Sequence, residues 1–117
     1  MYKVLALAFA AYFFSSSSFG APRAQSAEEC GIAADMALVA QSLAREEIQP
    51  AKAVAIMTRI YDLSGSERGT ALMRNILDAA YTRNATTGAV TPKLAEELFT
   101  ACMSSGGNMD AVLGRSL

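Results

Sequence analysis

The residues with the most distinctive chemistry in this sequence are two cysteines, Cys30 and Cys102. Histidine and tryptophan are absent, so no histidine can activate a serine or cysteine nucleophile or bind a metal. The two cysteines are far apart in the sequence, which excludes a CxxC redox or zinc motif. We expect a structural disulfide between them, formed in an oxidising compartment. The alternative is a free reactive thiol, which would need a neighbouring base or cation.

Three pairs of consecutive glutamates are the remaining candidates for acid–base chemistry: Glu28-Glu29, Glu46-Glu47 and Glu96-Glu97. Neighbouring residues on a helix diverge by about 100°, so the two carboxylates of a pair do not share one substrate. Hydrolysis by paired carboxylates requires both groups to face a common cleft. The sequence therefore predicts a protein that is not an enzyme, with no cofactor and no metal.

The charge pattern is more typical of protein binding than of nucleic-acid binding. The formal net charge is −1, whereas a nucleic-acid binder normally carries a basic footprint. Four arginines could form a patch for an acidic partner: Arg59, Arg68, Arg74 and Arg83. Among them, the candidate contacts are Arg59 and Arg74. Each also has an acidic residue at helical spacing, Asp62 and Asp78, and local ion pairs with them would make these arginines ordinary solvated side chains.

A short apolar tail after Gly106-Gly107 is a second candidate for partner binding. Met109, Val112 and Leu113 recur in it at helical spacing. In one interpretation the tail folds back and covers the core near the disulfide. In the other it detaches and docks on a partner's groove, or uncovers a groove of its own.

The first 26 residues resemble a secretory signal peptide. Lys3 precedes an unbroken apolar run from Val4 to Phe14, and small and polar residues follow. The run is shorter than the 20 or so residues that span a bilayer (about 30 Å of hydrocarbon). Small flanking residues favour cleavage after Ser26, with a cut after Gly20 as the second choice. We therefore expect a periplasmic or secreted protein with no stable membrane insertion after cleavage.

The remaining residues, 27–117, are expected to form a single all-α domain, a small bundle of four or five helices held by the disulfide. Apolar residues recur with a helical period, and no segment alternates as a strand would. A loop is expected at 84–90. The expected helices cover about 27–47, 50–62, 66–83 and 91–104, with a short tail helix at about 108–114.

The faces of these helices follow from the same periodicity. The third has the widest apolar face and is expected to be the most buried. The fourth has Thr91 as its N-cap and Pro92 in the first helical position. The first is expected to bury a stripe of large residues: Ile32, Met36, Val39 and Leu43.

This layout of a signal peptide, Cys30, Cys102 and a few helices resembles two groups of bacterial envelope proteins. One group comprises small periplasmic acid-stress chaperones, which release hydrophobic surface at low pH and hold unfolding clients. The other comprises periplasmic immunity proteins, which neutralise a cell-wall-degrading effector. Both resemblances imply binding to another envelope or secreted protein. We expect an inhibitor- or immunity-like binder, with a stress chaperone or structural envelope protein as the alternative. Because the chain has no histidine, an acid switch in such a chaperone must act through carboxylates.

Overall fold

A computed structural model describes residues 22–87 and 93–113 of the 117-residue chain. Within these ranges the chain is helical and contains no strand, which confirms the prediction of an all-α bundle. The predicted apolar signal segment, Thr91 and Pro92 lie outside the described residues. The helices are α2 (Ala27–Arg45), α3 (Pro50–Ile60), α4 (Glu67–Thr87), α5 (Lys93–Ser104) and α6 (Asp110–Leu113).

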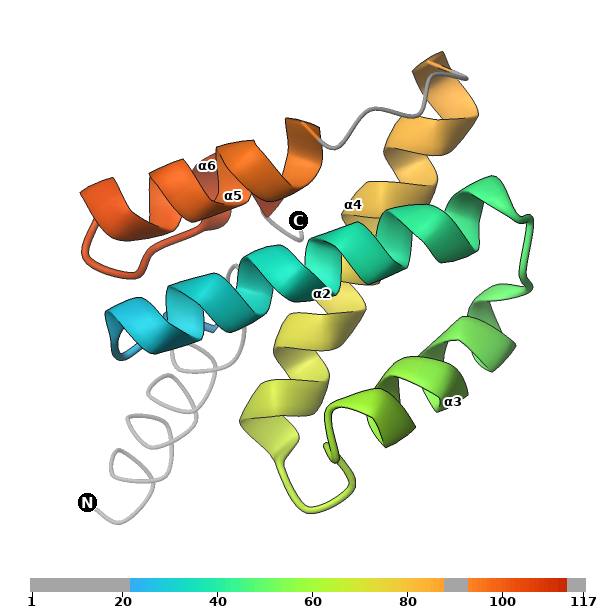
Figure 1. Ribbon diagram of the computed structural model, residues 1–117, viewed down its shortest axis with the longest axis horizontal. Helices are drawn as coiled ribbons and strands as arrows, with labels where there is room; N and C mark the ends of the chain where they lie inside the picture. Colours follow the sequence, from blue (N-terminus) through green and yellow to red (C-terminus); the bar gives the residue numbers. More distant parts are fainter. Residues whose placement is uncertain (1–21, 88–92, 114–117) are drawn as a thin grey trace, which may run out of the picture.

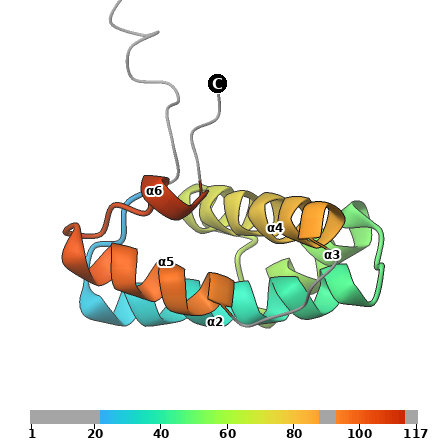
Figure 2. The ribbon, with the colours of Figure 1, turned by 90° about the horizontal axis from the view of Figure 1, so that it is seen from above.

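Helix α2 is the centre of the bundle (Figure 1). It packs mainly against α5, which runs beside it, and against α4, which crosses it. Helix α3 packs on α4 and on α2, and the short α6 packs on α5 and α4. Seen from above, α2 and α5 lie on one side of the molecule and α4 lies on the other (Figure 2). The core fills the space between these two layers.

The predicted apolar face of α4 is buried along its length and supplies much of this core. Met73 and Ile76 are completely buried, and Leu72 and Leu77 are nearly so. Leu98 of α5 packs into the same cluster. Large side chains from α4 and α5 therefore meet in the interior, as the wide apolar stripe of α4 predicts.

The buried face of α2 differs from the expected one. Of the expected stripe only Met36 is fully buried; Val39 and Leu43 are half-buried, and Ile32 is 41% exposed. Because α2 is covered on two sides, by α4 and by α5, small residues allow both neighbours to approach its backbone closely. The prediction of a bulky stripe was wrong for this reason. The buried face consists of Cys30, Ala33, Met36, Ala37, Ala40 and Ala44.

Helix α4 is longer than expected, so the predicted loop at 84–90 was wrong over its first four residues. The side-chain amide of Asn84 donates to the Ala44 carbonyl oxygen at 3.2 Å, at the end of α2. Thr86 donates to the Thr82 carbonyl oxygen at 2.9 Å, within its own helix. These bonds satisfy side chains that usually favour turns, and the Asn84 bond links the last turns of α4 to the end of α2.

Helices α2 and α3 each end two residues earlier than expected. The amide of Ile48 donates to the Leu43 carbonyl at 3.0 Å, and the amide of Leu63 donates to the Thr58 carbonyl at 2.9 Å. Both bonds are the long closing bond of a Schellman motif, in which one residue adopts a left-handed backbone. That residue is Glu47 in the first motif (φ 60°) and Asp62 in the second (φ 53°). Glycine normally occupies this position, so the sequence indicated a left-handed backbone at neither residue.

Candidate functional site

The two cysteines form the predicted disulfide, which joins α2 to α5. Their Cα atoms lie 5.7 Å apart, and the bond closes a sequence separation of 72 residues. Cys30 is 3% exposed and Cys102 is fully buried, so both sulfur atoms belong to the core. The described residues contain no free cysteine, and the alternative of a reactive thiol therefore does not apply.

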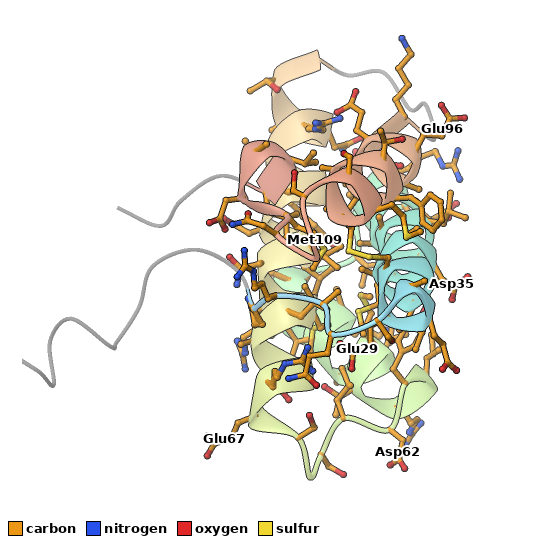
Figure 3. All side chains as sticks on the ribbon, turned by 90° about the vertical axis from the view of Figure 1, so that its left-hand side faces the viewer. Glu29, Asp35, Asp62, Glu67, Glu96 and Met109 are labelled. Carbon is orange, nitrogen blue, oxygen red and sulfur yellow. A yellow bond between two sulfur atoms is a disulfide. The ribbon has the colours of Figure 1, made fainter. Side chains whose placement is uncertain are left out.

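The tail after Gly106-Gly107 is packed against the bundle. Met109 points into the interior (Figure 3) and is completely buried. Val112 and Leu113 are half-buried and pack against the core, and their amides donate to the Met109 carbonyl oxygen at 3.1 and 3.0 Å. The structure thus has the folded-back arrangement. In this arrangement Met109 is not accessible to a partner.

The two arginines singled out in the sequence lie in different places. Arg59 is exposed at the end of α3. Arg74 is exposed on α4, at the rim of a hollow between α3 and α4. Among the described residues, neither the Arg59–Asp62 pair nor the Arg74–Asp78 pair forms an ion pair, so the predicted local pairing was wrong.

The ion pairs that do form in the described part of the chain join separate elements. Arg68 contacts Glu29 at 2.6 Å and so links α4 to α2. Arg83 contacts Glu97 at 2.6 Å and links α4 to α5. Glu28 is exposed beside the half-buried Glu29, whereas Glu96 and Glu97 are both exposed. The two carboxylates of the first pair therefore face different surroundings.

A largely apolar hollow in the described surface lies between α2 and the turn from α3 to α4. It measures about 240 Å³, and we call it the α2–α4 groove. Met36, Leu63 and Leu72 form its buried wall, and the exposed Ile32 stands at its edge. Sequence reasoning missed this groove because it placed Ile32 in the core. The residues that line the groove are Glu29, Ile32, Met36, Tyr61, Leu63, Arg68, Gly69 and Leu72.

Polar contacts frame the α2–α4 groove. Tyr61, which lines it, donates from its hydroxyl to Asp35 Oδ2 at 2.5 Å. Burial and the Asp35 carboxylate together raise the pKa of the Tyr61 hydroxyl, which keeps it protonated. The Glu29–Arg68 ion pair also lines the groove. Figure 3 shows Glu29 on the side of α2 that faces α4 and Asp35 on the outer side of the helix.

Glu29 is the most highly connected carboxylate of this region. Arg68 donates to both of its oxygens, at 2.6 and 3.3 Å, and the backbone amide of Gln25 donates to Oε1 at 2.8 Å. The bonds from Arg68, and to a smaller extent that from Gln25, lower the pKa of Glu29 below its ordinary value of 4.5. The same contact raises the pKa of Arg68. The ion pair is therefore intact at neutral pH.

Two kinds of site are not found among the described residues. No group of three or more cysteine, aspartate or glutamate side chains is placed to hold a metal ion. No described helix combines the length and apolar character that crossing a membrane requires.

Comparisons with protein-family models, with curated proteins and with solved structures find no match to this chain.

Proposed function

We propose that this chain is an exported protein that binds another envelope or secreted protein without catalysing a reaction. The N-terminal sequence pattern supports export. The disulfide supports it as well, because disulfides persist mainly in oxidising compartments. The proposed class of activity is that of an inhibitor or immunity protein, which acts by occupying its partner.

The α2–α4 groove is the proposed contact site, and one observation carries this choice. Ile32 is 41% exposed beside a hollow whose buried wall is apolar. Polar side chains, those of Glu29, Tyr61 and Arg68, also line this hollow. A hydrophobic centre with a polar rim is the usual anatomy of a protein interface. The partner chemistry that fits is one aliphatic or aromatic side chain, inserted beside Ile32 and surrounded by hydrogen-bonding groups.

The size of the groove also favours a protein partner over a small molecule. Its volume is about 240 Å³, below the roughly 300–1,000 Å³ of typical ligand pockets. A hollow of this size suits a single anchoring side chain, which is how many interface hot spots are built. The neighbouring backbone is fixed by the Glu29–Arg68 and Asp35–Tyr61 contacts, so the partner would meet a preorganised surface.

Affinity capture with two matched variants tests this proposal. Ile32→Glu places a charge at the edge of the groove, whereas Leu38→Glu places one on the same helix at a similarly exposed position (45%) outside the groove. The oxidised proteins are used to capture partners from envelope extract at pH 7. One stoichiometric partner that Ile32→Glu loses and Leu38→Glu retains is the expected result. Capture of no partner, or equal capture by both variants, contradicts the proposal.

An acid-activated chaperone is the second candidate, because several large apolar side chains are already exposed at the described surface. Protonation of Glu29 at low pH would break its ion pair with Arg68 and loosen the contact between α2 and α4. More apolar surface would then be available to unfolding clients. A protein that stays native at pH 3 and does not suppress client aggregation excludes this role. The exposed residues are Ile32, Leu38, Ile60, Phe99 and Met103.

A further inference from the structure

The five residues before α2 are part of the folded domain. We call residues 22–26 the N-terminal strap. The amide of Ala24 donates to the Gly107 carbonyl oxygen at 2.9 Å, and Ala24 is only 6% exposed. A Cβ atom at position 107 would overlap the Ala24 carbonyl group, so the glycine there leaves room for the strap. Figure 2 shows the strap, in blue, descending from near α6 to the start of α2.

The strap is also bonded to α2 and α4. Ser26 is the N-cap of α2, and its hydroxyl accepts a bond from the Glu29 amide at 3.2 Å. The carboxylate of Glu29 in turn accepts a hydrogen bond from the Gln25 amide at 2.8 Å. Arg68 donates to the Arg23 carbonyl oxygen at 2.5 Å as well as to Glu29. Four of the five strap residues are therefore bonded to α2, to α4 or to Gly107.

We infer that the signal peptide is removed between Gly20 and Ala21, so that the mature chain keeps the strap. The inference depends on the export proposed above. A signal peptidase would hydrolyse this peptide bond by adding one water molecule, which leaves a carboxylate on Gly20 and an ammonium group on Ala21. Ser18 and Gly20 supply the small residues that such an enzyme requires at the third and first positions before the cut.

A cut after Ser26 satisfies the same sequence rule but removes the strap. It would delete the N-cap of α2 and place a new ammonium group at Ala27, the first residue of the helix. A positive charge is unfavourable there, because the helix N-terminus already carries a partial positive charge. The cut would also leave the Gly107 carbonyl without its bond from Ala24 and Arg68 without its bond to Arg23. Both cleavage sites fit the sequence pattern, and the contacts of the strap favour the cut after Gly20.

The test is the mass of the exported protein. The full chain, with a C-terminal affinity tag, is expressed in a bacterium under its own N-terminal sequence, and the periplasmic product is analysed by intact mass spectrometry. The expected product begins at Ala21. A product that begins at Ala27, or an unprocessed chain, overturns the inference. A chain processed at Ala21 that captures no partner refutes the proposed function and leaves this inference standing.

Matched variants and one further measurement sharpen the test. Gly20→Leu is expected to block this cleavage, whereas Ser26→Leu is expected to be processed as the natural chain is; the reverse pattern overturns the inference. Hydrogen exchange on the processed protein then reports on the strap itself. The Ala24 amide should exchange slowly, because it is bonded to Gly107. Exchange of the Ala24 amide at the rate of an unstructured chain would remove the structural basis of the inference.

Discussion

Reduction of the Cys30–Cys102 disulfide is expected to lower the free energy of unfolding by about 4 kcal/mol, the chain-entropy value for a loop closed over 72 residues. The bond acts mainly on the unfolded chain, in which it prevents residues 30 and 102 from separating. A small domain has a total stability of about 5–15 kcal/mol, so the loss would be a large fraction of it.

The assay is urea unfolding of the same chain in its oxidised and reduced forms at pH 7, followed by far-UV circular dichroism. The midpoint urea concentration should fall markedly on reduction, while the helical signal in the absence of urea is retained. A double variant, Cys30→Ala with Cys102→Ala, is the control, because reductant should not change its midpoint. An unchanged midpoint for the natural chain on reduction would refute the reasoning. It would mean that the fold does not depend on the link between α2 and α5.

Three further predictions concern single side chains. Glu47→Gly should raise the free energy of unfolding by about 0.5–1 kcal/mol in urea titrations, because glycine adopts the left-handed backbone of this position (φ 60°) without strain. Gly106→Ala should lower the free energy of unfolding, because it puts a side chain on a left-handed backbone (φ 63°). A change of the same sign for both variants would contradict the assignment of strain. Glu29 has a lowered pKa, so its ion pair with Arg68 stabilises the fold above pH 4.5 and is lost as pH falls through the pKa of the folded state. Melting curves at pH 7 should therefore show Glu29→Gln to be less stable than the natural chain, with a difference that shrinks toward pH 3; a constant difference would exclude this origin. Tyr81→Phe should cost about 1 kcal/mol of stability at an unchanged m-value, because it removes the bond from the hydroxyl to the Ile48 carbonyl (2.6 Å); no loss would mean that water replaces this bond.

Features that depend on local periodicity were predictable from the sequence. The wide apolar stripe of α4 indicated its buried face, and an even number of cysteines indicated the disulfide. The buried face of α4 follows from the sequence of that one segment, and the disulfide follows from the presence of only two cysteines. The end of α4 was not predictable in this way, because Asn84 is held by a carbonyl group of α2, forty residues earlier in the chain.

The candidate site could not be read from the sequence, because it depends on how α2 is covered. A stripe of large residues usually marks a buried face, and by that rule Ile32 belongs in the core. The close approach of α4 and α5 instead buries the alanines and leaves Ile32 at the edge of the α2–α4 groove. The Glu29–Arg68 ion pair was missed for a similar reason, since its partners are 39 residues apart.

Binding through the α2–α4 groove, as proposed above, is tested most directly by the affinity of a captured partner for two variants of the protein. The dissociation constant is measured by calorimetry for the natural chain, Ile32→Glu and Leu38→Glu at pH 7. Ile32→Glu should weaken binding by about 2 kcal/mol or more, which is about 30-fold in Kd. Leu38→Glu should bind as the natural chain does. Equal affinities for all three proteins would contradict the claim.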